Sequence, residues 1–222
     1  YFGEIKSSPD NGDPEPIPVK LAETKKVYHE DNFASSPRLT MVFPTVDHKH
    51  ADASALELLS QLLSDGKKAP LYKVIVEEKK LAPNLYSYSG TQEIAGTFNI
   101  IVNAFPTTSL TDVEAAVHEA FARFESDGFT AEDLERLKAK YETGFYQGIS
   151  SVLGKGFQLA HYNEFYGSPD FANQLQKVLD VNMSDVKRVY EKYVKGQNYV
   201  MTNFVPKGKV DLVADGSVLF PI

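Results

Sequence analysis

Histidines beside acidic residues are the first groups in this sequence whose type and spacing could support chemistry, and two strings come close to a zinc motif. The string His161–Glu164 begins like His-x-x-Glu-His, which places two histidine ligands and a glutamate base on one helix face, but Phe165 replaces the second histidine. His118, followed by glutamate, begins like His-Glu-x-x-His, but Ala122 replaces its second histidine. We interpret His161 as a half-buried structural histidine and His118 as part of an exposed helix edge.

The remaining candidate metal ligands are too few for a specific site. His48 and His50 form a pair in a polar stretch with no further ligand nearby in sequence, and we interpret this stretch as a solvated loop. Glu57, in the first predicted helix, has Ser54 three residues before it and Leu58 directly after it, so that helix carries no histidine pair. The chain contains no cysteine, which excludes thiolate ligands and disulfides. We therefore expect neither a metal nor another cofactor to bind to this chain.

The sequence contains no motif for nucleophilic catalysis or for phosphate binding. Ser87 and Ser89 lie among tyrosines, without the Gly-x-Ser-x-Gly elbow that exposes a nucleophilic serine. The Gly-Lys-Gly string at 154–156 lacks the spacing and the Ser or Thr of a phosphate-binding loop. The acid pairs at 77–78 and 132–133 fall on helix faces that the pattern predicts to be exposed. The sequence predicts no catalytic residue.

Composition restricts the class of protein. The chain has 222 residues, 42% hydrophobic and 12% aromatic, which is typical of a globular protein with a substantial core. Its net charge of −7 makes nucleic acid and anionic membranes poor partners. No apolar run approaches the roughly 20 residues that span a bilayer.

The hydrophobic pattern predicts strands that alternate in groups with amphipathic helices. Strands are predicted near 25–30, 38–45, 84–89, 97–105 and 199–205. Helices are predicted over 51–65, from Pro70 to before Pro83, from Thr111 to Gly128, from Thr130 up to a break among the glycines at 144–156, over 157–166 and 170–180, and after a cap at Ser184. This order predicts an α+β fold, with helices packed on one face of a mostly antiparallel sheet.

Two terminal segments are predicted to be linkers. Residues 7–18 contain four prolines among polar residues, which is typical of a semi-rigid linker, with a disordered end as the alternative. The sequence thus predicts an N-terminal linker over 1–19, one domain over 20–206 and an exit linker over 207–222.

The stretch 69–90, which joins a short helix directly to a strand, carries a family resemblance. With the leucine-rich helix before it, this stretch resembles the second half-repeat of the insulinase/pitrilysin zinc metallopeptidases. Catalytic members show the frame Leu-Phe/Tyr-x-x-Leu-Arg-x-x-x-x-Leu-Ala-Tyr; its first and last pairs match Leu-Tyr at 71–72 and Leu-Ala at 81–82. The arginine of the frame falls on Val76 and its tyrosine on Pro83. In the family those two side chains help to hold substrate and transition state against the zinc, and this chain lacks both.

The resemblance implies a ferredoxin-like split β/α unit of the processing-peptidase type, without a zinc site of its own. The chain would be an inactive half-repeat that shapes the peptide-binding chamber, while a catalytic half-repeat of the same polypeptide supplies zinc for peptide-bond hydrolysis. Because the string at 1–5 resembles the close of a preceding half-repeat, we expect a piece of a longer protein. Long relatives with such linkers are often exported, so we expect a periplasmic or exported bacterial protein.

Two rival interpretations stay open at this stage. One is a structural or assembly module of the same fold without protease activity, similar to the core subunits of respiratory complexes. The other is a free-standing peptide-binding domain. The aromatic run Tyr162, Phe165, Tyr166 and Phe171 fits either the wall of a peptide groove or a packed interface between helices.

Tyr86 and Tyr88 are the candidate contact residues, because strand alternation puts both rings on the face opposite Leu85 and Ser87. We expect this face to meet peptide or the partner repeat; the alternative is that a long helix of the same domain covers the rings.

Overall fold

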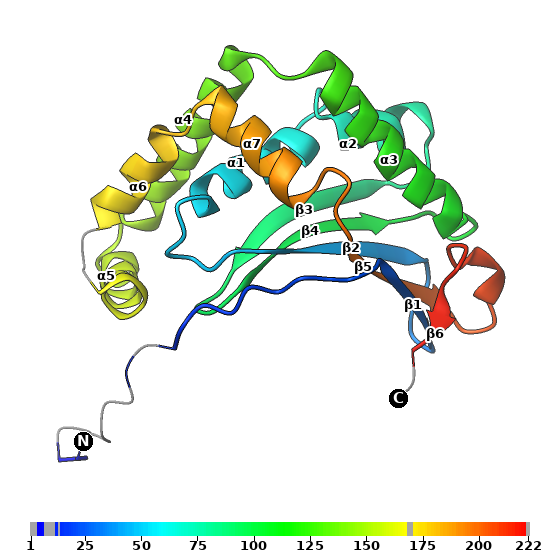
Figure 1. The fold of residues 1–222 in the computed structure, drawn as a ribbon, viewed down its shortest axis with the longest axis horizontal. Coiled ribbons are helices and arrows are strands. Elements are labelled where there is room, and N and C mark those ends of the chain that lie inside the picture. The colour runs from blue at the N-terminus through cyan, green and yellow to red at the C-terminus, as the bar shows by residue number, and fades with distance from the viewer. Residues whose placement is uncertain (1–3, 7–11, 13, 168–170, 221–222) are drawn as a thin grey trace.

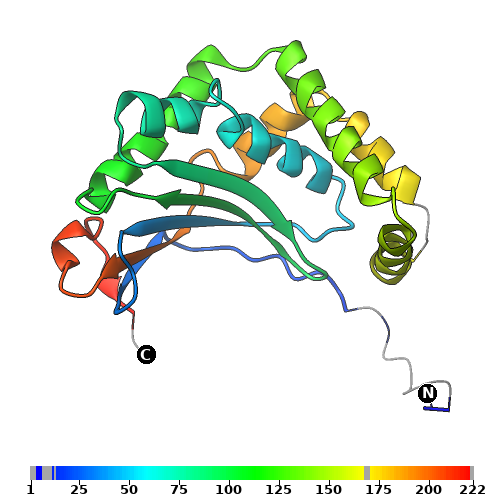
Figure 2. The ribbon, with the colours of Figure 1, turned by 180° about the vertical axis from the view of Figure 1, so that it is seen from behind.

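A computed structural model describes residues 4–6, 12, 14–167 and 171–220, in which helices cover one face of a curved six-stranded sheet (Figure 1). The strands lie in the order β3-β4-β2-β5-β1-β6. The α+β class and the packing of helices on one face are confirmed. Figure 2 shows the same arrangement from behind, with the concave face of the sheet turned away from the helices.

The described elements follow the predicted order closely. The strands are β1 (Lys25–Asp31), β2 (Arg38–Thr45), β3 (Asn84–Thr91), β4 (Gly96–Asn103), β5 (Val200–Pro206) and β6 (Val218–Leu219). The helices are α1 (Ala53–Ser64), α2 (Pro70–Tyr72), the π-helix η1 (Lys73–Glu78), α3 (Leu110–Asp127), α4 (Ala131–Gly148), α5 (Val152–Tyr166), α6 (Phe171–Leu179), α7 (Met183–Tyr193) and the 3₁₀ turn η2 (Val210–Leu212).

The sheet is mostly antiparallel, with a parallel edge. β2 pairs antiparallel with β4 on one side and with β5 on the other, and β3 pairs antiparallel with β4. β1 pairs parallel with both β5 and β6. β2 therefore lies in the middle of the sheet, and its main-chain groups are paired along both edges.

Strict alternation along β2 decides which face of the sheet becomes the core. Leu39, Met41 and Phe43 are at most 1% exposed beneath the helices, whereas the residues between them point to the uncovered face. The same side receives the leucines of α1, which explains why that helix is so rich in leucine. One large core thus lies between the sheet and the helical layer.

Two helix caps differ from the sequence prediction. Ser109, rather than Thr111, caps α3, and its side chain accepts a hydrogen bond from the Thr111 backbone N–H. Asn182, rather than Ser184, caps α7, and it forms a reciprocal capping box with Asp185. In both cases a polar residue two positions earlier already satisfies the free N–H groups of the first turn.

The helix predicted from Pro70 to before Pro83 ends earlier, because its second half is wound as a π-helix. The Lys79 N–H donates to the Val74 carbonyl at 3.0 Å, which is the i→i−5 bond of a π-turn. Lys80 then takes a φ of 53°, in the left-handed region that ends helices. This turn brings Leu81 back onto the core before β3 begins.

The segments expected to be linkers contact the domain where the structure describes them. In the predicted N-terminal linker, the Ile17 N–H donates to the Ile94 carbonyl at 2.6 Å. Within the predicted exit linker, Leu212 and Ala214 are buried and β6 pairs with β1. Part of 207–220 therefore belongs to the sheet layer rather than to a free linker, because its apolar side chains complete the core beside β1.

α5 differs from the other helices, since it lies beside the end of the sheet rather than over it (Figures 1 and 2). It has no buried residue, and the exposed fractions of Val152, Leu153 and Phe157 are 90%, 70% and 70%. The break predicted among the glycines before it is confirmed, because α4 ends at Gly148 and α5 begins at Val152. The helix itself starts earlier than the predicted 157, because Ser151 caps its first turn.

Candidate functional site

The histidines do not come together as metal ligands. His48 is buried, with Nδ1 2.9 Å from the Gln92 carbonyl and Nε2 2.7 Å from the Phe165 carbonyl, so both ring nitrogens are engaged by the backbone. His48 is thus a packed structural residue, not the solvated loop residue that the sequence indicated. His161 is exposed on α5, not half-buried as the sequence indicated, and its ring contacts that of Phe165 on the same helix. Of the predicted aromatic run, Phe165 and Tyr166 contact the ring of His48, and the side chain of Phe171 lies outside the described residues.

The other two candidate histidines also have local structural partners. His50 Nδ1 accepts a hydrogen bond from the Asp52 backbone N–H at 3.0 Å. His118 Nε2 lies 3.2 Å from the Tyr199 hydroxyl, on the partly exposed edge of α3. No group of three or more His, Cys, Asp or Glu side chains in the described ranges has the geometry to hold a metal ion.

Glu57 lies on α1, and its surroundings do not suit a metal. Burial raises the pKa of the Glu57 carboxyl, although a hydrogen bond from Gln61 at 3.1 Å opposes this rise. Ser54 stands one turn before it, where a histidine ligand is required. The residues on this helix therefore do not fit zinc.

The serines and acid pairs likewise have structural roles. The Ser87 hydroxyl is buried and donates to the Ser60 carbonyl at 2.7 Å, which ties β3 to α1. Glu78 pairs with Arg123 at 2.7 Å, and the hydrogen bonds of that guanidinium lower the pKa of Glu78. Asp133 closes a capping box with Thr130. None of these groups has the orientation of a nucleophile or an acid–base pair.

The two positions where the catalytic frame expects arginine and tyrosine are apolar. Val76 is partly buried and packs against the core, and Pro83 is exposed at the turn into β3. Neither side chain can donate a hydrogen bond to a substrate.

The uncovered face of the sheet is the main candidate surface, and Tyr86 and Tyr88 lie on it. Their exposed fractions are 46% and 43%, and their rings stack with a centroid separation of 6.3 Å. Leu85 and Ser87, on the opposite face, are buried beneath the helices. No helix of the described chain covers the two rings, so the alternative of a covering helix is wrong.

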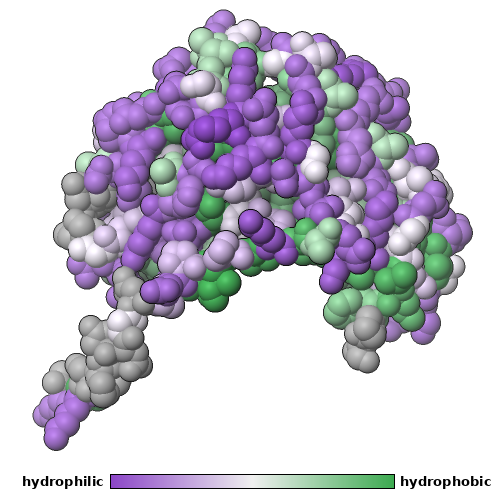
Figure 3. All heavy atoms as spheres, in the orientation of Figure 1, coloured by the Kyte–Doolittle hydropathy of each residue, from purple (hydrophilic) through white to green (hydrophobic). Residues whose placement is uncertain are grey.

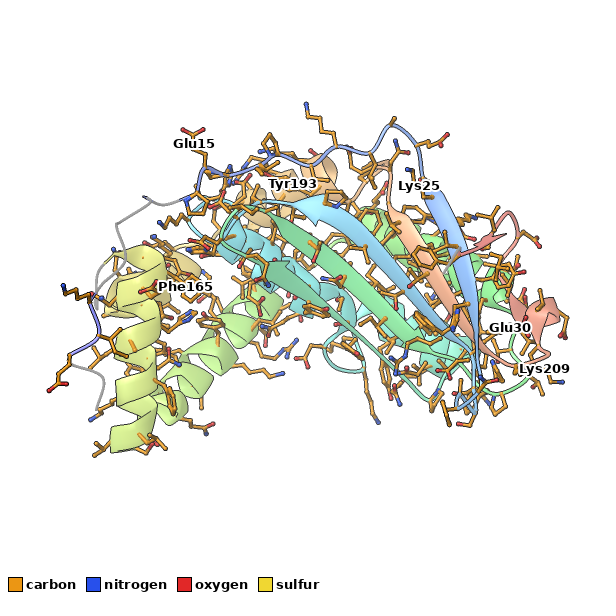
Figure 4. All side chains as sticks on the ribbon, turned by 90° about the horizontal axis from the view of Figure 1, so that it is seen from below. Glu15, Lys25, Glu30, Phe165, Tyr193 and Lys209 are labelled. Atoms are coloured by element: carbon orange, nitrogen blue, oxygen red, sulfur yellow. The ribbon has the colours of Figure 1, made fainter. Side chains whose placement is uncertain are left out.

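The strand register arranges this surface into three rows, which we call the open face. Paired residues in neighbouring strands point to the same side of the sheet. The rows are Asn84, Asn103, Arg38, Phe204 and His29; then Tyr86, Ile101, Thr40, Thr202 and Val27; then Tyr88, Asn99, Val42, Val200 and Lys25. Figure 4 views the molecule from this side, with Lys25 labelled at the start of β1. In Figure 3, hydrophobic residues line parts of the hollowed underside.

The first row contains a hydrogen-bonded ladder that the sequence did not reveal. Arg38 Nε donates to Asn103 Oδ1 at 2.8 Å, and Asn103 Nδ2 donates to Asn84 Oδ1 at 2.8 Å. Three strands thereby hold one arginine in place. The available signal was one polar residue near an end of each of three predicted strands, but only the register shows that they share a row.

The edge of the sheet beside the tyrosines is also open. β3 pairs with β4 alone, so its other edge has main-chain groups without a partner strand among the described elements. A separate hollow of about 620 Å³ lies between residues 16–21 and the end of β2, and its lining includes Thr45, Lys192 and Tyr193. This hollow is apart from the tyrosine pair, because neither tyrosine lines it.

Comparison with known proteins identifies the scaffold. Residues 1–141 match the family model described as the Peptidase M16 inactive domain. A zinc protease of Helicobacter pylori, PqqE, is 24% identical over 201 residues, which cover 88% of this chain and 44% of that protein.

Solved structures show the same fold. A protease from Helicobacter pylori has a TM-score of 0.75 at 21% identity and covers 92% of this chain and 50% of its own. The periplasmic protease PqqL from Escherichia coli has a TM-score of 0.67 at 13% identity, covering 84% of this chain and 21% of its own. The chain thus spans about half the length of the curated relative and of the first of these structures. Among the described helices, none has the length and apolarity to cross a membrane.

Proposed function

Because the chain belongs to the family of Peptidase M16 inactive domains, we propose that it is the non-catalytic half of a zinc metallopeptidase and forms a wall of the peptide chamber. The zinc that activates water for peptide-bond hydrolysis is then held by a catalytic half-repeat of the same polypeptide. The domain runs from about residue 20 through the ordered segment beyond 206. Because PqqL is named a periplasmic protease, we also propose the periplasm as the compartment.

The open face with its two stacked tyrosines carries this proposal. An uncovered, largely uncharged sheet face is unusual for a protein that functions alone, since such faces are normally covered by a second layer. Tyrosine combines a large apolar ring with a polar hydroxyl, which suits it to contact with a peptide. The unpaired edge of β3 lies beside both rings, and extended peptides bind to such edges through main-chain hydrogen bonds.

α5 supports the second part of the proposal, the contact with the catalytic half. Its apolar side chains Val152, Leu153 and Phe157 are at least 70% exposed. Val152 and Leu153 are adjacent in sequence, and Phe157 lies one helix turn after Leu153. Water contact with this surface is unfavourable by about 25 cal/mol for each Å² of apolar area, so burial against another repeat would stabilise the pair. We infer that α5 packs on the catalytic half-repeat.

Replacement of both tyrosines by serine in the whole polypeptide tests the chamber role. The double variant Tyr86→Ser, Tyr88→Ser should cleave a mixed peptide library with a changed selection of peptides, while its melting temperature stays close to that of the wild type. Tyr72→Ser, in the helical layer, is the matched control and should leave the selection of peptides unchanged. A large loss of stability with unchanged selection would show that the rings are ordinary packing residues and would refute the proposal.

A peptidase assay of the whole polypeptide also distinguishes the proposed function from the rival interpretation, a structural module of the same fold. A purified whole polypeptide that cleaves no peptide in the presence of zinc, yet assembles stably through α5 with other subunits, would support a structural module of this fold. The sequence that precedes the domain in the whole polypeptide provides a second test, because His-x-x-Glu-His there favours the peptidase.

A further inference from the structure

All formal charges in the three rows of the open face are positive. Arg38 and Lys25 carry them, although the chain as a whole has a net charge of −7. The acid that follows next on this side of β1, Asp31, accepts a hydrogen bond from the Phe33 N–H at 2.8 Å. The three rows therefore carry two positive charges among aromatic and uncharged residues, which is complementary in charge to a partner with a carboxylate.

Arg38 is held in a defined orientation by the ladder of the first row. Its Nε donates to Asn103 Oδ1, and the Asn103 amide is in turn held by Asn84. Since Nε is engaged, the two terminal nitrogens of the guanidinium remain for a partner, and Arg38 makes no other hydrogen bond or ion pair with the described residues. A planar fork that is oriented in advance loses little conformational freedom when it binds a carboxylate through two hydrogen bonds.

Aromatic side chains lie on both sides of this arginine across the sheet. Phe204 is paired directly with Arg38 and is 40% exposed. Its ring meets that of His29 edge-on, with a centroid separation of 5.9 Å. Tyr86 lies one row further along, on the other side of β4. A bound segment that places an acidic residue on Arg38 can therefore place apolar side chains against rings to either side.

The position of Arg38 in the sheet favours an acidic side chain over the end of a chain. β2 is paired along both edges from Arg38 to Val42, so that stretch of the strand offers no free main-chain N–H to a ligand. Recognition of a terminal carboxylate normally uses a nest of such N–H groups. From charge, orientation and surroundings, we propose that Arg38 binds the side-chain carboxylate of an Asp or Glu in a peptide segment that lies across the open face. This inference rests on the proposed function, in which a peptide meets that face.

Binding of matched peptides to the 222-residue protein tests the inference. The probes are a capped heptapeptide with glutamate between two phenylalanines, the same peptide with glutamine, and the glutamine peptide with a free terminal carboxylate. Affinities come from NMR titration, followed through the Arg38 side-chain Nε–H signal and the tyrosine rings. The glutamate peptide should bind roughly three- to tenfold more tightly than the capped glutamine peptide, and this ratio should shrink in high salt.

Variants connect the preference to one side chain. Arg38→Gln should bind both capped peptides equally, and Arg38→Lys should keep only part of the preference because lysine lacks the planar fork. Arg136→Gln, which changes an exposed arginine on α4 in the helical layer, is the control and should keep the full ratio.

The inference would be overturned by equal affinity of the capped peptides for the wild type, by a preference that persists in Arg38→Gln, or by tightest binding by the peptide with the free terminus. Absence of binding by all three peptides would also overturn it. The proposed function is judged independently: if the Tyr86 and Tyr88 replacements change peptide selection while glutamate gains nothing here, only the role of Arg38 is wrong.

Discussion

The hydroxyl of Tyr193 lies 2.7 Å from Oδ2 of Asp52, and this hydrogen bond joins the last helix of the chain to the start of the first. Arg188 Nη1 and Lys192 Nζ reach the same carboxylate at 2.5 and 3.0 Å. Asp52 is only 3% exposed, so α7 supplies three donors to one buried charge. The cluster fixes α7 against α1, and both helices cover the same face of the sheet.

Replacement of Asp52 by asparagine should destabilise the protein. The variant keeps the size of the side chain but removes the charge that three donors from α7 require, so we expect a loss of roughly 1–3 kcal/mol in the free energy of unfolding. Chemical denaturation at pH 7 measures this loss. Asp211→Asn, at an exposed turn, is the control; an equal effect of both replacements would contradict the importance of the cluster.

The same carboxylate should contribute to acid sensitivity. Burial opposes ionisation of Asp52, but the hydrogen bonds from Tyr193, Arg188 and Lys192 outweigh this effect and lower its pKa from 3.8 to about 2. A lowered pKa means that the stabilisation is fully present above the unfolded value and is lost as the pH falls from about 4 to about 2. Wild type and Asp52→Asn should therefore converge in stability across this window, which denaturation at a series of pH values can show.

Glu57 should behave in the opposite way. Burial raises its pKa, so the folded state favours the protonated carboxyl and its contribution to stability falls as the pH rises through the raised pKa. Glu57→Gln, which is neutral at every pH, should be more stable than the wild type at pH 7. The exposed Glu191→Gln serves as control; a loss of stability in Glu57→Gln at pH 7 would contradict this account.

His48 should control how firmly α5 is attached. Its ring lies between the Gln92 carbonyl of the β3–β4 hairpin and the Phe165 carbonyl of α5, with one ring nitrogen within hydrogen-bond distance of each. His48→Phe keeps a ring but removes both polar contacts, so the local stability of α5 should fall by roughly 1–3 kcal/mol.

Hydrogen exchange of the α5 amides measures the change at His48. His29→Phe, on the open face, should leave that exchange unchanged, whereas uniform acceleration across the whole protein in His48→Phe would indicate global unfolding instead.

The isolated chain should neither bind zinc tightly nor cleave peptides. Its candidate histidines have local structural partners, α1 lacks a histidine pair, and Val76 and Pro83 occupy the positions of the catalytic arginine and tyrosine. Metal analysis of protein purified without a histidine tag checks the first statement, and a chelator-controlled peptide assay checks the second. Stoichiometric, chelator-resistant zinc or chelator-sensitive cleavage would refute the assignment of this half as inactive.

The sequence by itself determined the order of elements and the class of fold, because both follow from local patterns. The alternation of Leu39, Met41 and Phe43 in β2 and the leucine stripe of α1 fix which residues seek the core, whatever the distant chain does. The predicted caps of α3 and α7 were wrong by two residues, because neighbouring Ser, Thr and Asn residues compete as helix caps. The sequence also showed that the catalytic arginine and tyrosine are missing, because the frame that contains them is one continuous string of residues.

Only the tertiary structure decided which residues meet. Arg38 and Asn103 are 65 positions apart, and Asp52 and Tyr193 are 141 apart, so their contacts depend on strand register and helix packing rather than on local preference. The pattern placed Tyr86 and Tyr88 opposite the core, but it did not show whether a helix covers them. Whether a helix covers the two rings depends on which side of the sheet each connection carries its helix to. In this fold, every described helix that covers the sheet lies on the side of Leu85.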